Sequence, residues 1–137
     1  MISAREAACQ ALMRYEKRGT FPATTLEELY RSHAMERRER ALSAELTYGT
    51  LEKLLPIDYF LETVSTKPIR ALDAPVRAIL RIAAYQILYL DRIPDHAAVN
   101  EAVDMAGRIS PRGKGFVNGV LRSLARQKES LSLPSGG

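Results

Sequence analysis

The sequence has little of several features that define other protein classes. Its 137 residues include one cysteine and no tryptophan, which excludes a disulfide scaffold and a cysteine-rich zinc site. The two histidines, His33 and His96, lack metal-ligand spacing, so no metal is expected. There is neither a GxGxxG fingerprint nor a loop ending in Gly-Lys-Ser/Thr. Nucleotide binding therefore has no support.

Long apolar runs are also missing. The most apolar region, residues 75–90, is interrupted by Arg77 and Arg81 and is shorter than the roughly 20 residues that a membrane span needs. The amino terminus does not show the basic segment, apolar run and cleavage site of a signal peptide. We therefore expect a cytoplasmic protein without a transmembrane helix.

What is present is the composition of one globular domain, with 46% apolar and 26% charged residues. No segment alternates with a two-residue period, and every segment reads as a helix or a helix-breaking turn. The pattern predicts an all-α domain over residues 1–129. Residues 130–137, rich in Ser, Pro and Gly, are expected to be a linker or a disordered tail.

Capping residues and prolines predict about seven helices. Ser3 caps the first helix and Gly19 ends it, while the box at Thr25 opens the second. The next helices are expected over residues 36–55, from residue 56 to Pro68 and over residues 74–90. A sixth helix is capped by Asp95 and ended by Gly107, and the seventh follows residue 115.

Apolar spacing predicts the buried faces of two of these helices. The helix over residues 74–90 is apolar nearly all round, with a thin polar seam of Arg77, Arg81 and Gln86, so we expect it to lie at the centre. The helix over residues 36–55 is expected to bury one stripe, formed by Ala41, Ala44, Tyr48, Leu51 and Leu55, with Leu42 and Leu46 flanking it.

No catalytic constellation is found. Cys9 lies beside a buried stripe with no histidine near it in sequence, which favours a structural thiol over a nucleophile. Glu27 and Glu28 are better explained as charges at a helix start than as an acid/base pair.

Positive charge is concentrated at the end of the chain. Residues 105–137 contain six Arg or Lys and one Glu. This asymmetry indicates either a polyanionic partner such as nucleic acid or a solvated terminal helix. Arg112 and Lys114 lie just before the seventh helix, where backbone amides favour phosphate. Phe116 is expected either in the core or stacked on an unpaired base, and Asn118 projects from another side.

Three short segments in register carry a family resemblance. They are residues 79–89 (ILRIAAYQILY), 98–103 (AVNEAV) and 116–122 (FVNGVLR), with Arg92-Ile93-Pro94 after the first. In order and spacing they resemble the NusB-like domain over nearly the whole chain. The resemblance implies an all-α helical bundle of two packed three-helix subdomains.

Two members of this superfamily are candidates for the function. One is the free-standing antitermination factor NusB, which binds boxA RNA together with ribosomal protein S10. The other is the amino-terminal domain of the RsmB (Sun/Fmu) type 16S rRNA cytosine-C5 methyltransferase. Residues 45–51 and 91–100 look like the methyltransferase version. Only Arg5 remains of the arginine-rich start that is common in NusB, whereas Glu52 departs from the methyltransferase pattern.

The resemblance favours a non-catalytic RNA-binding module that docks a methyltransferase on rRNA. S-adenosylmethionine would then bind a catalytic domain that this chain lacks. The expected RNA contacts are Arg5, Arg112, Lys114, Phe116, Asn118 and Arg122. A protein-interaction module that binds the catalytic domain or a ribosomal protein is a further alternative. The glycines at 115 and 119 would permit a homodimer, although small residues in a core explain them more simply.

Overall fold

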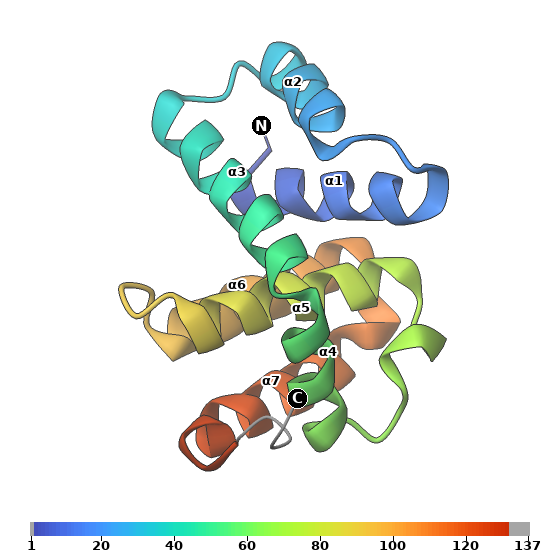
Figure 1. Ribbon diagram of the computed structural model, residues 1–137, viewed down its shortest axis with the longest axis vertical. Coiled ribbons are helices and arrows are strands. Elements are labelled where there is room, and N and C mark those ends of the chain that lie inside the picture. The colour runs from blue at the N-terminus through green and yellow to red at the C-terminus, as the bar shows by residue number, and fades with distance from the viewer. Residues whose placement is uncertain (1, 132–137) are drawn as a thin grey trace. The chain divides into compact units, whose positions relative to one another are not determined.

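The structure is a computed structural model that describes residues 2–131, and those residues form helices and turns without a β-strand. The α-helices are α1 (Ala4–Arg18), α2 (Pro22–His33), α3 (Arg37–Glu52), α4 (Leu54–Val64), α5 (Ala74–Tyr89), α6 (Asp95–Ile109) and α7 (Lys114–Gln127) (Figure 1). Three short 3-10 helices are η1 (Ile69–Ala71), η2 (Pro111–Gly113) and η3 (Lys128–Ser130). The all-α fold of about seven helices is confirmed.

The chain divides into two compact units, with the boundary between Glu52 and Lys53. The first unit holds α1 to α3, and the second holds α4 to α7, one helix more than a three-helix subdomain. Most of the expected tail, residues 132–137, lies outside the described residues. None of the described helices combines the length and apolar character of a membrane span.

The first helix begins and ends where the sequence predicts. The Ser3 hydroxyl accepts a hydrogen bond from the Glu6 amide at 3.1 Å, which satisfies one of the free donors of the first turn. Gly19 has a φ of 71°, and its amide donates to the Tyr15 carbonyl at 2.9 Å. The left-handed conformation explains why glycine ends this helix.

Several other helix boundaries were predicted wrongly, among them the boundary expected at residues 55 and 56, since α3 ends at Glu52 and α4 begins at Leu54. The second helix begins at Pro22, not at Thr25, because proline fits the first helical position, where no amide donor is needed. The sixth helix continues through Gly107 to Ile109. Asp95 is its first residue, not its cap, and the Asp95 carboxylate instead binds Lys128 at 2.9 Å.

The predicted buried stripe of α3 was wrong in part, since Ala44 and Leu51 are half-buried but the other three residues are exposed. Tyr48 is 46% exposed, and Leu55 belongs to α4 and is 84% exposed. The buried residues of α3 are instead Ser43, Leu46, Thr47 and Thr50. Two of these buried hydroxyl groups bond within their own helix: Ser43 donates to the Arg40 carbonyl at 2.8 Å and Thr47 to the Ser43 carbonyl at 2.7 Å. The buried Thr50 hydroxyl has no hydrogen-bond partner among the described residues.

The first unit has a small core to which α1 contributes short side chains. Helix α1 contacts both α2 and α3. The buried cluster consists of Ile2, Ala7, Ala11, Leu26, Leu29 and Met35, with Tyr30 and Ala44 packed against it. Alanine on α1 allows the helix backbones to approach closely, so the three helices form a compact layer.

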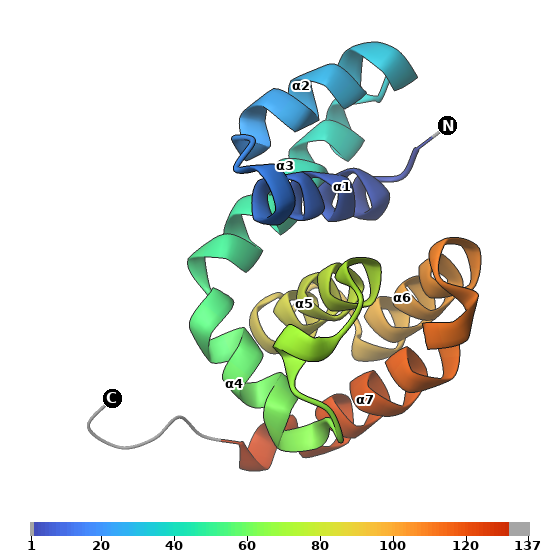
Figure 2. The same cartoon turned by 90° about the vertical axis from the view of Figure 1, so that its right-hand side faces the viewer.

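Helix α5 is the centre of the second unit, as predicted. It contacts α4, α6 and α7 (Figure 2), and its fully buried side chains include Ile79, Leu80 and Ile82. Gln86 was predicted on the polar seam but is buried, and its side-chain amide donates to the Ile82 carbonyl at 3.1 Å. Arg81 joins α5 to α4 through two hydrogen bonds to the Asp58 carboxylate, at 2.9 and 2.7 Å.

The turn before α7 depends on a close approach at Gly113. A Cβ atom at Gly113 would lie 2.7 Å from Cγ2 of Val76 on α5. A Cβ atom at Gly115 or Gly119 would meet nothing within 4 Å. The idea that those two glycines are small residues of a core was therefore wrong, because both are exposed on α7.

Gly113→Ala is expected to lower the free energy of unfolding by about 1–3 kcal/mol, because the new methyl group overlaps a β-branched side chain that has little freedom to move. Gly119→Ala is the matched control and is expected to raise it by about 0.5–1 kcal/mol through helix propensity. Urea unfolding followed by circular dichroism measures both. Equal stability of the two variants would contradict the close approach at Gly113.

Candidate nucleic-acid interface

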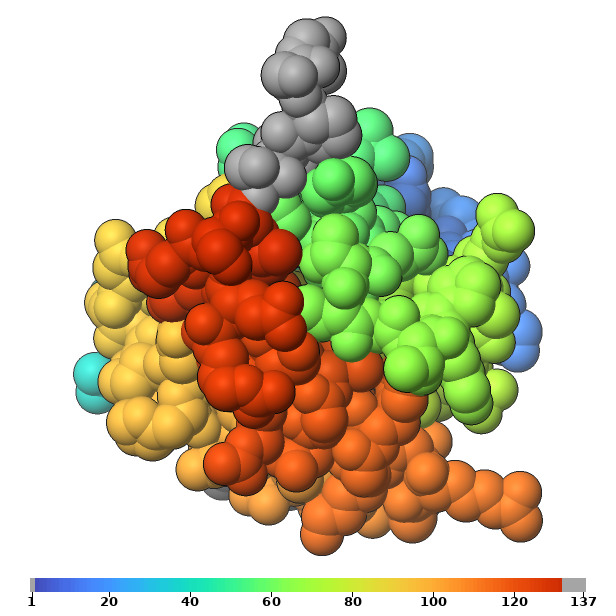
Figure 3. All heavy atoms as spheres, turned by 90° about the horizontal axis from the view of Figure 1, so that it is seen from below, coloured from blue at the N-terminus to red at the C-terminus, as the bar shows by residue number. Residues whose placement is uncertain are grey.

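Helices α6 and α7 pack side by side and leave a groove between them. The hollow has a volume of about 350 Å³. Its lining comes from one face of each helix: Asp95, His96, Val99 and Asn100 on α6, and Asn118, Arg122, Ala125 and Arg126 on α7. These positions repeat at three- and four-residue spacing, which places them along one side of each helix. In Figure 3, α7, drawn in orange and red, is exposed along this surface.

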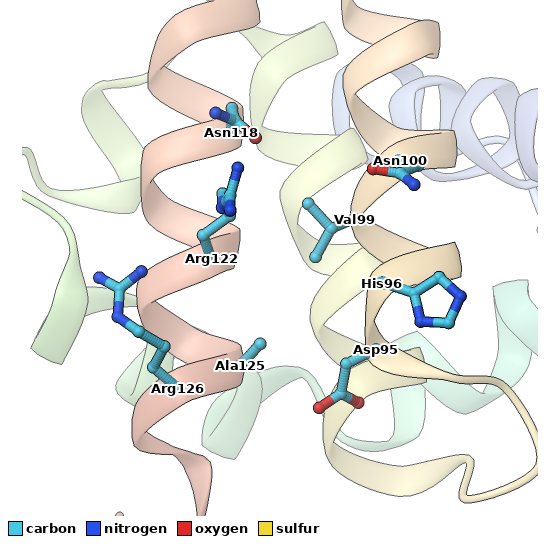
Figure 4. A pocket seen from close by; sticks show the side chains of 8 residues that line it. All are labelled: Asp95, His96, Val99, Asn100, Asn118, Arg122, Ala125 and Arg126. Carbon is cyan, nitrogen blue, oxygen red and sulfur yellow. The ribbon is translucent and has the colours of Figure 1, made fainter.

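The polar groups are distributed along the length of this groove. Figure 4 shows Asn100 and Asn118 near one end, on opposite helices, and Asp95 and Arg126 toward the other end. Val99 is buried and points between the helices, where it forms part of the floor. The groove therefore offers amide donors and acceptors beside cations, over an apolar base.

The cations of the groove are not neutralised within the protein. Arg122 and Arg126 are exposed and make no ion pair with any described residue. The acidic lining residue, Asp95, is paired with Lys128 at 2.9 Å. Because the Asp95 carboxylate pairs with a lysine outside the lining, it does not pair with the two arginines, and their guanidinium groups are available to an external anion.

The turn that precedes α7 presents two further exposed cations, Arg112 and Lys114. The backbone here differs from the predicted phosphate cradle. The Gly113 amide donates to the Ser110 carbonyl at 2.8 Å, and the Lys114 amide donates to the Pro111 carbonyl. Since η2 occupies these two amides, neither is available to an anion, whereas the side chains of Arg112 and Lys114 are exposed.

Phe116 lies at the edge of the core. Its ring is neither fully buried in the core nor fully exposed for stacking on a base, the two predicted alternatives. It is half-buried and lines a second hollow, of about 220 Å³, together with Lys67 and Arg112. The Lys67 ammonium group lies 5.6 Å from the centre of the Phe116 ring, within the range of a cation–π contact. Sequence reasoning missed Lys67, because only packing brings the segment before η1 to the start of α7.

The structure thus brings together some of the predicted contacts and separates others. Asn118 and Arg122 share the α6–α7 groove, while Arg112 and Phe116 share the smaller hollow. Arg5 belongs to the other unit, where it is half-buried and already makes a contact within the protein. Arg5 is therefore the weakest of the predicted phosphate ligands.

Six of the eight lining residues of the groove were not among the predicted contacts: Asp95, His96, Val99, Asn100, Ala125 and Arg126. Asn100 stood in the motif AVNEAV, and Arg126 in the basic end of the chain, so a signal existed for each. Their alignment with Asn118 and Arg122 required knowing that α6 and α7 pack together.

Cys9 is buried, as expected for a structural thiol. Burial raises the pKa of the Cys9 thiol, and the nearby Glu6 carboxylate raises it further. The thiol therefore stays protonated at neutral pH, which does not suit a nucleophile.

Comparisons with known proteins agree with this geometry. The sequence profile of the NusB family matches residues 2–126. The chain is 37% identical, over 91% of its length, to the probable ribosomal RNA small subunit methyltransferase B of Bacillus subtilis (strain 168), of which it covers 28%. It is 32% identical, over 95% of its length, to the ribosomal RNA small subunit methyltransferase B of Cronobacter sakazakii, of which it covers 30%. The chain thus spans less than a third of the length of these curated relatives.

Two solved structures share the fold. T. maritima NusB superposes with a TM-score of 0.79 at 26% identity, over 93% of this chain and 95% of that one. A chain from the crystal structure of a plectonemic RNA supercoil superposes with a TM-score of 0.85 over 94% of this chain and 96% of that one. Its 21% identity shows similarity of the fold alone.

Proposed function

The chain belongs to the NusB family, and from this premise we propose that it is an RNA-binding module: the non-catalytic amino-terminal domain of a 16S rRNA cytosine-C5 methyltransferase, which helps to dock the enzyme on rRNA. The ribosomal RNA methyltransferases among its relatives support this assignment, since each is more than three times as long as the aligned region.

The observation that carries the proposal is the groove between α6 and α7. Arg122 and Arg126 provide two unpaired guanidinium groups, which match the geometry of phosphate oxygens. Asn100 and Asn118 can donate and accept hydrogen bonds at base edges or ribose hydroxyls. A groove that combines phosphate ligands with amides suits a single strand or the loop of an RNA hairpin.

The turn before α7 would extend this interface. Arg112 and Lys114 are exposed at the start of the helix that carries Asn118 and Arg122, so they can neutralise phosphates beyond the groove. Phe116 is half-buried, so a base could contact only the exposed part of its ring, beside Lys67.

We propose that methyl transfer takes place outside this chain. The described residues form helices only, whereas a cofactor such as S-adenosylmethionine would need the remaining part of a longer enzyme. The role of this chain is then to bind and orient rRNA, with the methyltransferase domain as its covalent partner.

A second candidate is a free-standing NusB-type antitermination factor that binds boxA RNA with a ribosomal protein. One observation favours it: the chain covers 95% of T. maritima NusB, nearly the whole of that protein. The position of Arg5 weighs against it, because this residue of the first turn is half-buried and already in contact with the protein.

RNA affinity measured against salt concentration separates these functions. The test compares a small-subunit rRNA hairpin, a boxA-type single strand and a scrambled strand. We expect the chain to prefer the hairpin. The slope of log affinity against log salt is expected to be negative, with a magnitude of at least about 2.8, because Arg112, Lys114, Arg122 and Arg126 each contribute about 0.7. Selective binding of boxA would make the antitermination factor the better assignment. Absence of binding to all three at low salt would contradict both functions and favour a protein-interaction module.

A further inference from the structure

The first unit has a groove of its own, between α2 and α3. Its volume is about 550 Å³, larger than that of the α6–α7 groove. The lining residues are Glu27, Tyr30 and Arg31 on α2, and Arg37, Arg40, Ala41 and Ala44 on α3. Both helices are labelled in Figure 1. We call this hollow, defined by those seven residues, the α2–α3 groove.

Three arginines give the α2–α3 groove a positive charge. Arg31, Arg37 and Arg40 are exposed, and none forms an ion pair with a described residue. Glu27 is the acidic residue of the lining. The lining therefore has three guanidinium groups and one carboxylate, and this net positive charge favours an anionic partner.

Two of the neighbouring carboxylates, Glu28 and Glu39, are directed elsewhere and do not reduce this charge. Glu28 on α2 pairs with Arg14 on α1 at 3.0 Å. Glu39 on α3 accepts a hydrogen bond from the Ala4 amide at 2.9 Å, at the start of α1, where a carboxylate also favours the helix dipole. Both acids hold the three helices together, so neither neutralises the arginines of the α2–α3 groove.

Tyr30 is held in a fixed position on the wall of the groove. Its hydroxyl lies 2.7 Å from Oγ of Ser43 and 3.1 Å from the Arg40 carbonyl oxygen, and it can donate its one proton to either of them. The guanidinium carbon of Arg40 lies 5.9 Å from the centre of the Tyr30 ring, which is the range of a cation–π contact. A preorganised aromatic ring beside a guanidinium group is suited to contact with a ribose or a base.

We propose that the α2–α3 groove is a second RNA-contact surface, in which Arg31, Arg37 and Arg40 bind backbone phosphates and Tyr30 contacts a nucleoside. RNA fits better than an acidic peptide, because it carries one phosphate at every nucleotide and supplies the flat groups that an aromatic ring binds. The inference rests on the proposed function, but it uses residues of the other unit.

The test is the salt dependence of RNA affinity for the full 137-residue chain carrying R31Q/R37Q/R40Q. Three lost phosphate contacts are expected to reduce the magnitude of the slope of log affinity against log salt by about 2. The matched control is K17Q/R18Q/R38Q, which removes three exposed cations of the same unit outside the α2–α3 groove and is expected to leave the slope unchanged. Thermal unfolding confirms that each variant is folded.

Ultraviolet crosslinking of bound RNA, followed by tryptic digestion, gives an independent readout. A crosslink on the peptide that contains Tyr30 supports the proposal. An unchanged slope for R31Q/R37Q/R40Q without that crosslink overturns it. If R31Q/R37Q/R40Q leaves the slope unchanged while R122Q/R126Q reduces its magnitude, only the second RNA-contact surface is contradicted. If neither variant reduces the magnitude of the slope, the proposed function is contradicted as well. If R31Q/R37Q/R40Q loses binding to a polyglutamate peptide that the parent chain binds, but keeps its RNA affinity, the proposal is overturned in favour of an acidic protein partner.

Discussion

The double variant R122Q/R126Q is expected to reduce the magnitude of the slope of log RNA affinity against log salt by about 1.4, which corresponds to two lost contacts with single-stranded phosphates. Both side chains line the α6–α7 groove, and neither is paired with a described carboxylate. Adding R112Q and K114Q should bring the total reduction to about 2.8. Fluorescence anisotropy of a labelled rRNA hairpin between low and physiological salt measures this change.

The control for this variant removes the same charge from another place. K17Q/R18Q takes two exposed cations from the end of α1, so it changes the net charge equally and leaves the groove intact. Its slope is expected to equal that of the parent chain. Equal slopes for R122Q/R126Q and K17Q/R18Q would show that RNA affinity depends only on the net positive charge of the chain and that the groove does not bind phosphate.

Leu80→Ala is expected to lower the free energy of unfolding by about 3 kcal/mol, within the range of about 2–5 kcal/mol for a buried leucine. Leu80 has no exposed surface and lies on α5, the helix that α4, α6 and α7 surround. Removing three carbons there leaves a cavity at the centre of the second unit. The midpoint of urea unfolding measures the loss, together with the denaturant dependence, which should not change.

The matched control is Leu55→Ala, since Leu55 is 84% exposed on α4. Its free energy of unfolding is expected to change by less than about 0.5 kcal/mol. A loss of under about 1 kcal/mol at Leu80 would contradict the central position of α5. We expect the RNA affinity of the folded fraction to stay unchanged in both variants.

The two ends of α1 and the central helix were predictable because local chemistry determines them. Ser3 and Gly19 act within their own turns, and α5 is apolar around nearly its whole circumference, so no choice of face was needed. The face of α3 was not predictable from apolar spacing. Its buried hydroxyls on Ser43 and Thr47 bond to the backbone of the same helix, which removes most of the cost of burying them.

The candidate site was predictable only along a single helix. Asn118 and Arg122 stand one turn apart in a recognisable motif, and they do share the α6–α7 groove. Their neighbours across the groove, Asn100 and His96, come from α6, and the contact between Phe116 and Lys67 joins distant segments. Tertiary packing creates these pairs, so one sequence contains no local signal for them.

A titration of the 15N-labelled chain with the rRNA hairpin, followed by amide NMR, tests whether RNA binds in the α6–α7 groove. We expect shifts in the backbone amides of α6 and α7 and in the side-chain amides of Asn100 and Asn118, which lie on the two walls of the groove. Binding that leaves both side-chain amides and the α6–α7 backbone unshifted would contradict the claim that this groove holds RNA.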